Sequence, residues 1–237
     1  MLLIAALIAA APMPLIVIDA GHGGAQDGAI GVCGVKEKDV TLGVSQHLVA
    51  LLEQSGKVRA IATRDGDVTL DLAARAQFAN DAKADMFISV HANSNSAKKT
   101  QGVETFFLSR TASDRRVAKL VARENEAATT VPAQADETAR LVETLALSAS
   151  HVESARLAER VNTSLTRELG AKGRGVLQAP FFVLLAAHMP STLIEVGFLT
   201  NQTECDKLSS DVHRERLAQI IASAILLHVS REELVKL

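Results

Sequence analysis

The 237-residue sequence predicts an α/β fold with a largely parallel central sheet. Short runs of apolar, β-branched residues alternate along the chain with longer segments in which apolar residues recur at helical spacing. Short links between the two kinds of segment favour strands joined by helices, the order found in layered folds with parallel sheets. Hydrophobic residues make up 48% of the chain, so a single domain of this size has enough apolar side chains to form a core.

The expected strands are apolar runs without a helical period, bounded by turn residues. The first, residues 15–18, follows Pro14 and leads through Asp19 into a glycine-rich turn. Residues 58–62 end at a turn-like Asp-Gly-Asp sequence, and residues 86–90 lead directly to His91. Strands are expected at residues 15–18, 58–62, 86–90, 103–108, 181–185 and 192–196.

The expected helices lie between these runs and carry apolar residues three and four positions apart. Within residues 70–80, this spacing turns Phe78 toward the core together with Leu72, Ala73 and Ala76. Residues 219–229 are apolar but too short to cross a bilayer, so they are expected to form part of a core helix, and no membrane span is predicted. Helices are expected at residues 39–54, 70–80, 113–126, 135–147, 152–169 and 212–229.

The chain divides into an apolar leader at residues 1–13 and a single domain at residues 14–232. Three alanines at positions 9–11 are typical of a signal cleavage site, but no lysine or arginine precedes them. The leader is therefore either the remnant of a secretory signal or a hydrophobic approach to the first strand. One segment, residues 125–150, is an insertion in an otherwise compact plan and is expected to be a lid, a regulatory helix or a surface decoration.

The charge and the aromatic content argue against nucleic-acid binding. The chain has 25 lysines and arginines against 27 aspartates and glutamates, a net charge of −2, whereas nucleic-acid-binding proteins usually have a basic excess. Tryptophan and tyrosine are absent, so stacking surfaces for single strands are scarce. No nucleic-acid partner is expected.

The two cysteines do not form a metal-binding pair. Cys33 and Cys205 lie far apart and make no CxxC motif. Spacing alone does not establish a disulfide between them. Cys33 is expected to be a small buried side chain rather than a ligand.

Two histidines and a glutamate are expected to meet at one edge of the sheet. His22 follows the first strand in a turn with Gly21, Gly23 and Gly24, and His91 ends the third strand. The carboxyl ends of parallel strands share an edge, and Glu37 can reach it from the loop before the next helix. Two histidines and a glutamate are the ligand set of a catalytic zinc site with one position open for water. The glycines would allow a sharp turn and a close approach to a bound group; an anion cradle or a plain turn are the alternatives.

Glu195 is the fourth candidate because it interrupts the apolar run at residues 192–196. A buried carboxylate is costly unless it is paired or used. Alone, it fits a salt bridge at the end of a strand; beside the three ligands, it fits a general base acting on water. Asp19, next to the turn, is a candidate for orienting a ligand.

The motifs together resemble zinc-dependent N-acetylmuramoyl-L-alanine amidases over residues 14–229. Several separate motifs occur in the order of that family, which makes the resemblance more specific than one glycine-rich turn. They are Ile18-Asp-Ala-Gly-His-Gly-Gly24, Asp27-Gly-Ala-Ile-Gly31, Glu37-Lys-Asp-Val40, Thr63-Arg-Asp65, Leu72 with Arg75, Ala79-Asn80, Ala84-Asp-Met-Phe-Ile-Ser-Val-His-Ala-Asn93 and Met189-Pro-Ser-Thr-Leu-Ile-Glu-Val-Gly-Phe-Leu-Thr-Asn201.

The resemblance implies a single-domain, mixed six-stranded sheet flanked by helices, and one Zn²⁺ held by His22, Glu37 and His91. It implies Glu195 as the catalytic residue for hydrolysis of the amide between N-acetylmuramic acid and L-alanine in peptidoglycan. The implied setting is cell-wall remodelling and daughter-cell separation by an exported protein in the periplasm or cell envelope.

Some members of this family carry an inserted helix that blocks the site until an activator protein displaces it. The segment at residues 125–150 resembles that helix in position, with Asp136, Glu137 and Glu143 as candidate autoinhibitory acids. Two other functions compete with the amidase: a catalytically silent protein that binds zinc and peptidoglycan to regulate wall hydrolysis, and an anion- or nucleotide-binding domain. The turn at residues 21–24 lacks the GxGxxG fingerprint and no Walker lysine follows it, which argues against the latter.

Overall fold

A computed structural model describes residues 12–127 and 137–235, and its centre is a six-stranded mixed sheet. The strands lie in the order β2-β1-β3-β6-β4-β5, and all neighbouring pairs are parallel except β4 and β6. The expected mixed α/β sheet is confirmed. The strands are β1 (Leu15–Ala20), β2 (Arg59–Ala62), β3 (Met86–Asn93), β4 (Val103–Leu108), β5 (Gly173–Ala179) and β6 (Ser191–Phe198).

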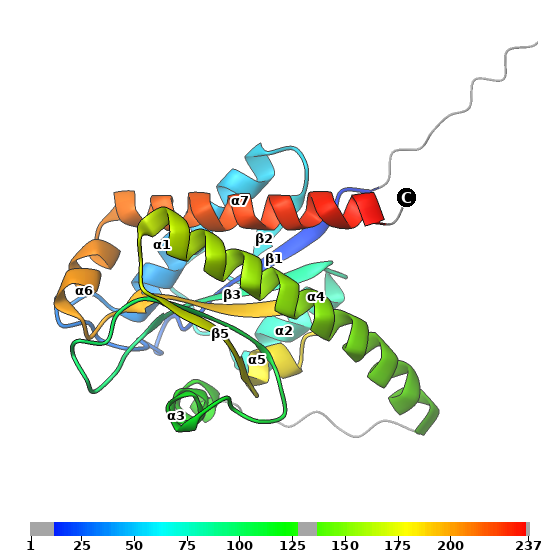
Figure 1. Cartoon of the computed structure of the whole chain (residues 1–237), viewed down its shortest axis with the longest axis horizontal. Helices are drawn as coiled ribbons and strands as arrows, with labels where there is room; N and C mark the ends of the chain where they lie inside the picture. Colours follow the sequence, from blue (N-terminus) through cyan, green and yellow to red (C-terminus); the bar gives the residue numbers. More distant parts are fainter. Residues whose placement is uncertain (1–11, 128–136, 236–237) are drawn as a thin grey trace, which may run out of the picture.

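Helices cover both faces of the sheet (Figure 1). On one face, α1 (Glu37–Gln54), α4 (Glu137–Leu169) and α7 (Asp211–Val235) pack over a core that includes Ile18 and Ile88. On the other, α2 (Leu72–Asp81), α3 (Arg115–Glu124) and α5 (Phe182–Leu185) cover Phe87 and Phe106. A 3₁₀ turn, η1 (Asn125–Ala127), follows α3, and α6 (Gln202–Ser209) follows β6.

The fifth strand lies elsewhere than expected. Residues 181–185 were expected to be a strand, but Phe182–Leu185 form the short helix α5, and the strand is β5, which the apolar pattern did not indicate. β5 lies at the edge of the sheet, is partly exposed and contains two glycines, so it has no continuous apolar run. A short apolar run does not by itself distinguish a strand from a buried helical turn.

Three expectations about helices were also wrong. Residues 135–147 and 152–169 were expected to be two helices, but the structure has one helix, α4, across both. The helix α6 was not predicted. Phe78 is 40% exposed rather than inward, because the buried face of α2 carries Ala76, Ala79 and the Arg75 side chain instead.

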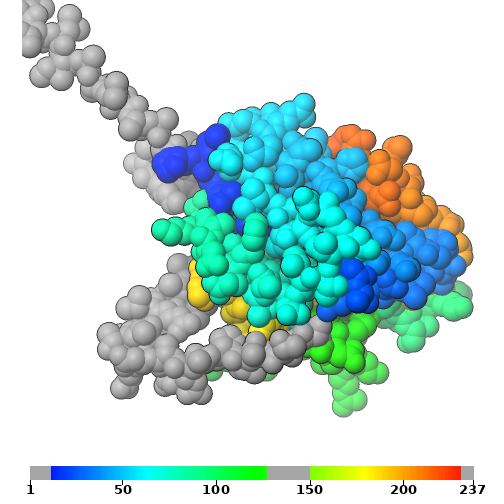
Figure 2. Space-filling view, turned by 180° about the vertical axis from the view of Figure 1, so that it is seen from behind, coloured from blue at the N-terminus to red at the C-terminus, as the bar shows by residue number. Residues whose placement is uncertain are grey.

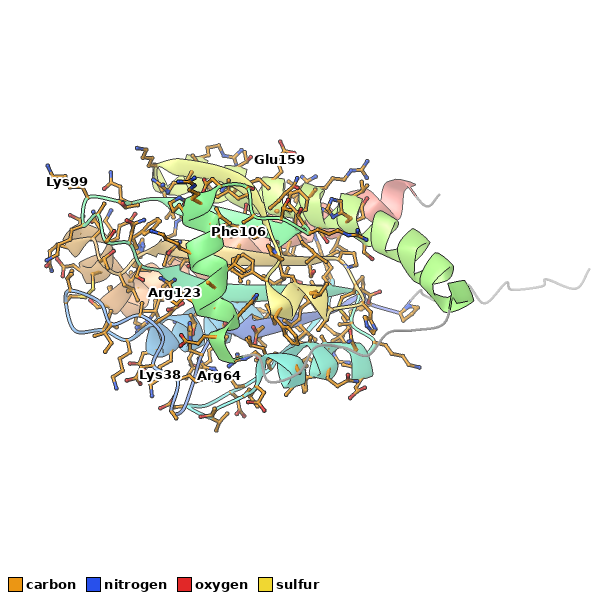
Figure 3. All side chains as sticks on the ribbon, turned by 90° about the horizontal axis from the view of Figure 1, so that it is seen from below. Lys38, Arg64, Lys99, Phe106, Arg123 and Glu159 are labelled. Atoms are coloured by element: carbon orange, nitrogen blue, oxygen red, sulfur yellow. A yellow bond between two sulfur atoms is a disulfide. The ribbon has the colours of Figure 1, made fainter. Side chains whose placement is uncertain are left out.

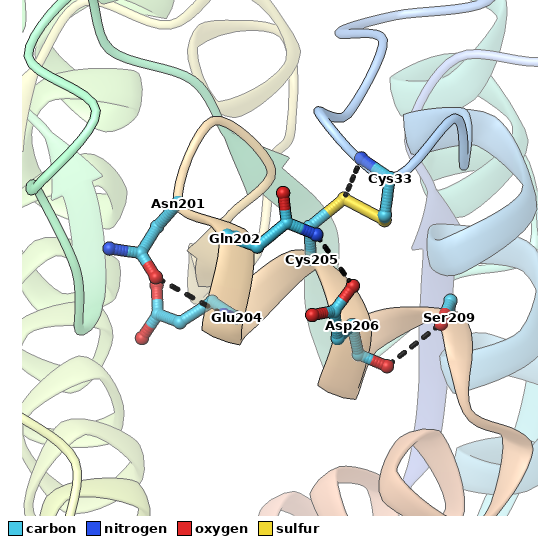
Figure 4. The surroundings of a disulfide bond; sticks show 7 residues. All are labelled: Cys33, Asn201, Gln202, Glu204, Cys205, Asp206 and Ser209. Carbon is cyan, nitrogen blue, oxygen red and sulfur yellow. Dashed lines mark hydrogen bonds between the residues drawn. A yellow bond between two sulfur atoms is a disulfide. The ribbon is translucent and has the colours of Figure 1, made fainter.

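A disulfide joins Cys33 to Cys205 (Figure 4), and Cys33 is only partly buried, so the expectation that it is a small buried side chain was wrong. Cys33 lies in the loop between β1 and α1, and Cys205 is a buried residue of α6. Its Sγ accepts a hydrogen bond from the Cys33 backbone N–H. The bond fastens the loop ahead of α1 to the helix that follows β6. Spacing alone did not bring the two residues together, because they are 172 positions apart.

The described residues include no helix both long and apolar enough to cross a membrane. The apolar residues 219–229 belong to α7, where Ile221, Ile225 and Val229 are buried in the core as expected. Residues 1–11 of the predicted leader (residues 1–13) lie outside the described residues, so the nature of the leader stays a prediction.

Candidate active site

The site lies where β1 and β3 end side by side. Ala20 of β1 is in register with Val90 of β3, and Gly21 N–H donates to the Val90 carbonyl. The strands therefore carry His22 and His91 to the same edge, with their ring centroids 5.0 Å apart and the rings close to perpendicular. His91 is the sixth residue of β3 rather than a loop residue, because the strand continues to Asn93. The predicted convergence of the two imidazoles is confirmed.

Glu37 reaches the two histidines from the first turn of α1. Its Oε1 lies 3.0 Å from His91 Nδ1 and 3.2 Å from His22 Nε2. The same oxygen accepts a hydrogen bond from Ala92 N–H, and Oε2 accepts one from Ala29 N–H. These bonds fix a carboxylate that is only 1% exposed between the imidazoles.

The glycines of the turn leave room for the protein's own side chains. A Cβ at Gly21 would lie 2.5 Å from His91 Cε1 and Nε2, and a Cβ at Gly28 would lie 2.7 Å from both Glu37 and His22. At Gly23 and Gly24 a Cβ would collide with the backbone of Val68 and with Thr69. The close approach expected at Gly21, Gly23 and Gly24 is therefore to neighbouring residues of the chain.

Two buried arginines hold the backbone of this turn. Arg64 donates to the Ala20 and Gly21 carbonyls, and Arg75 donates to the Ala20 and His22 carbonyls. Arg75 also pairs with the buried carboxylate of Asp19 at 2.9 Å. Asp19 thus acts on the site through Arg75, one step further from the ligands than its place in the sequence suggested. The clamp fixes His22, whose φ of 60° lies in the left-handed region that non-glycine residues rarely adopt.

Glu124, at the end of α3, also reaches the histidines and was not among the predicted residues. Its Oε2 lies 3.3 Å from His22 Nε2 and 3.4 Å from His91 Nδ1, while Oε1 pairs with Arg123. Figure 3 shows α3 crossing in front of the sheet, with Arg123 near its C-terminal end. A signal was present in the sequence: Glu124 takes an apolar-stripe position in line with the buried Val117 and Val121.

The donor set of this cluster fits a zinc ion. One ligand atom from each of His22, Glu37, His91 and Glu124 lies within 4.8 Å of the other three. His22 Nε2 is buried and makes no well-formed hydrogen bond, although two carboxylate oxygens are close to it. Burial lowers the pKa of His22, but Glu37 and Glu124 overcome this and raise it to about 10. The carboxylates therefore stabilise positive charge at the point where the donor atoms meet, and imidazole and carboxylate are ligands that suit zinc.

Glu195 lies beside this cluster on the central strand β6. It is in register with His91 on one side and with Glu104 on the other. Its side chain is fully buried, and within the described residues neither carboxylate oxygen has a hydrogen-bond partner and no ion pair forms. Burial, with Glu37 and Glu124 nearby, raises the pKa of Glu195 well above the ordinary value. The salt-bridge alternative is not observed.

The neighbouring carboxylate, Glu104, has the opposite surroundings. It is fully buried too, but it pairs with Arg116 and Arg174 and accepts a hydrogen bond from Asn93. Glu104 is thus neutralised in the structure, whereas Glu195 is left available for proton transfer.

A cavity of about 380 Å³ opens onto the cluster. On the side of the molecule seen in Figure 2, the blue and cyan residues of the first part of the chain form much of the surface, and the green of the α3 region borders them. The cavity is lined by Gly21, His22, Gln26, Gly28, Ala29, Leu72, Arg75, His91, Arg123, Glu124 and Glu126.

The predicted autoinhibitory acids are not tested by these contacts. Asp136 lies outside the described residues. Glu137 and Glu143 belong to the first part of α4, residues 137–149, where the structure describes the backbone but not the side chains. Figure 1 shows the first turns of α4 extending past the sheet.

The strand-end cluster with its adjacent buried carboxylate defines a class of protein: a hydrolase built on an α/β sheet. Comparisons with known proteins identify the family. A family model described as N-acetylmuramoyl-L-alanine amidase matches residues 16–226. The chain belongs to this family of amide hydrolases, as the motifs predicted.

Curated relatives and solved structures agree. The amidase AmiA of Escherichia coli (strain K12) is 30% identical over 217 residues, which cover 90% of this chain and 75% of AmiA. The amidase LytC of Bacillus subtilis (strain 168) is 32% identical over 206 residues, 87% of this chain but 34% of LytC. The chain thus spans only about a third of LytC.

Two structures share the fold over nearly their whole length. The amidase AmiC2 of Nostoc punctiforme superposes with a TM-score of 0.69 at 29% identity, covering 92% of this chain and 97% of AmiC2. The CwlD amidase of Clostridioides difficile, solved in complex with the GerS lipoprotein, has a TM-score of 0.69 at 26% identity, covering 92% and 98%.

Proposed function

We propose that this protein is a zinc-dependent hydrolase that cleaves the amide between N-acetylmuramic acid and L-alanine in peptidoglycan. The observation that carries the proposal is the fully buried Glu195, which has no partner in the described residues and adjoins the cluster of His22, Glu37, His91 and Glu124. A carboxylate in this position is costly to the fold, and proton transfer is a use that explains it.

Each residue then has a distinct part in the mechanism. His22, Glu37 and His91 would hold the zinc, which when bound supplies Lewis acidity to polarise the scissile carbonyl. Glu195 takes a proton from the attacking water and later gives it to the leaving amine. Its raised pKa suits both steps, because the group must accept a proton and then release it. Arg64 and Arg75 hold the turn that positions His22.

Metal analysis combined with a dye-release assay on labelled cell walls tests this function. We expect one zinc per chain and hydrolysis that a chelator removes and added zinc restores. A catalytically silent regulator would also bind zinc and walls, but would release no dye under any condition, including with Glu124 replaced. That result would favour the regulatory alternative.

We further propose that Glu124 holds the site closed by filling the position that water and substrate need. Its Oε2 is as close to His22 Nε2 as the Glu37 oxygen is, at 3.3 against 3.2 Å. The segment at residues 125–150 follows directly, so an activator protein that binds this insertion would withdraw Glu124. The related CwlD amidase, solved with the GerS lipoprotein, provides a precedent for a protein partner.

The Glu124→Gln variant and a deletion of residues 126–149 test this closure. Both should raise dye release from isolated walls, by about tenfold for the point variant if one charge-assisted contact maintains closure. Glu159→Gln is the matched control, because Glu159 is exposed on α4 and lies away from Arg123 and the C-terminal end of α3 (Figure 3). Unchanged or lower activity in both altered proteins would exclude autoinhibition by this segment.

The disulfide supports an exported protein that acts in the periplasm or cell envelope. Structural disulfides form and persist in oxidising compartments and are rare in the cytosol. We extend the proposal to wall remodelling and daughter-cell separation, two processes in which this amide is cut. Fractionation of cells should find the oxidised protein outside the cytoplasm; a reduced cytoplasmic protein would contradict this location.

A further inference from the structure

A second cavity of about 380 Å³ lies next to the first, and Arg123 lines both. It is bounded by the turn after β3 on one side and by one face of α3 on the other. We call it the basic cavity, and its polar wall includes Ser94, Asn95, Arg116, Lys119, Arg123 and Thr200. The three basic residues recur at intervals of three and four, so α3 presents them on a single face.

The lining of the basic cavity contains cations but no carboxylate. Arg116 is paired from below with the buried Glu104, and Arg123 is paired with Glu124 in the neighbouring site. Lys119 is exposed and has no ion-pair partner in the part of the chain that the structure describes. The cavity therefore has one positive charge without an ion-pair partner in the described residues, that of Lys119, beside the two paired arginines.

The uncharged residues of the wall also favour an anion. Asn95 accepts the Ala97 N–H through Oδ1, which leaves its amide NH₂ as a donor. The Thr200 hydroxyl oxygen accepts the Asn95 N–H, which leaves the hydroxyl hydrogen to be donated. A ligand with several acceptor oxygens and a negative charge satisfies these groups, and a carboxylate has that chemistry.

We propose that the basic cavity binds a carboxylate on the peptide portion of the substrate and that Lys119 determines this specificity. This inference rests on the proposed function, because an extended peptide bound at the cluster would pass Arg123 to reach the second cavity. Lys119 lies five residues before Glu124, on a part of α3 that other contacts hold in place. The middle of α3 is anchored by Val117, Leu120 and Val121, and Arg116 is fixed on Glu104.

Turnover of two soluble N-acetylmuramoyl-peptides tests the proposal, one with its peptide carboxylates free and one with them amidated. Amidation should lower kcat/KM about tenfold, mainly by raising KM, because one hydrogen bond to a charged group is lost. Lys119→Gln should cause a similar loss on the free acid and little change on the amide. Lys119→Arg should recover the preference, and Lys57→Gln, which changes an exposed lysine away from the site, should leave both values unchanged.

Calorimetry on the Glu195→Gln protein separates this inference from the proposed function. It measures the binding of the two muramoyl-peptides, the acid with free carboxylates and the amide with amidated carboxylates. The unaltered protein could hydrolyse neither substrate while the acid peptide still binds about tenfold more tightly than the amide. If Lys119→Gln then removes this difference in affinity, the carboxylate site is supported and the amidase activity is not. Equal binding of the acid and amide peptides, or a preference that Lys119→Gln does not alter, would overturn the site even if hydrolysis proceeds.

Discussion

Glu37 and Glu195 are equally buried carboxylates at one site, yet their surroundings give them opposite properties. Glu37 accepts hydrogen bonds from two backbone N–H groups and lies against two histidines. Burial raises its pKa, but His22 and His91 lower it well below the ordinary value. Glu195 has no partner in the described residues, and both burial and the charge of Glu37 raise its pKa.

The difference supports the two roles that we propose. A carboxylate held ionised between two imidazoles is suited to bind a cation permanently, whereas one with a raised pKa is suited to exchange a proton. The fold produces this difference: Glu37 stands at the start of α1, within reach of the Ala29 and Ala92 N–H groups, whereas Glu195 lies in the middle of β6, where no donor of the described residues reaches its carboxylate oxygens.

The largest expected effect comes from removing the charge of Glu37. Glu37→Gln should lower zinc affinity by more than about a hundredfold and reduce dye release to background, because a ligand is lost and not merely a group that supports one. Metal content after dialysis and activity should fall together. If Glu37→Gln retains one tightly bound zinc, the assignment of Glu37 as a ligand is wrong.

A smaller effect is expected from a substitution that crowds the ring of His91, which Glu37 contacts. In Gly21→Ala the new Cβ would collide with the His91 ring, so we expect a loss of about 1–3 kcal/mol in the free energy of unfolding together with reduced activity. Gly66→Ala is the matched control, since a Cβ there meets open space. Equal unfolding midpoints in a urea titration of the two variants would contradict this account of the turn.

The smallest effect concerns the pH dependence of Glu195. The reaction needs the ionised carboxylate, so the acid limb of kcat/KM should lie above pH 4.5, the ordinary value for a glutamate. Glu124 contributes to the raised pKa of Glu195, so Glu124→Gln should lower that pKa and move the acid limb to lower pH. A limb that stays in place or moves to higher pH in Glu124→Gln would mean that Glu195 does not set it.

Strands β1 and β3 were more predictable than the edge strand β5. Buried parallel strands such as β1 and β3 are continuous apolar runs, and their shared edge places His22 beside His91 without further information. The edge strand β5 carries no such run, and α5 resembles a strand in composition. Whether each segment forms a strand or a helix depends on its position in the fold, which the local sequence indicates only indirectly.

The site was predictable where residues lie on strand ends and less so where a long-range contact is needed. Glu195 interrupts an apolar strand, a signal visible locally. Glu124 reaches the cluster only because α3 packs across the strand ends, and the pairing of Cys33 with Cys205 depends on how α6 returns to the first loop. The clamp formed by Arg64 and Arg75 likewise depends on carbonyl groups that the fold gathers.

The most direct test of the account measures zinc content and turnover on the same sample of Glu195→Gln. The amide is close to the carboxylate in shape and leaves Glu37 and the two histidines untouched. We predict one zinc per chain, as in the unaltered protein, and a fall in dye release of about a thousandfold, within the range for loss of a general base. Retained hydrolysis with zinc bound would show that Glu195 does not transfer the proton.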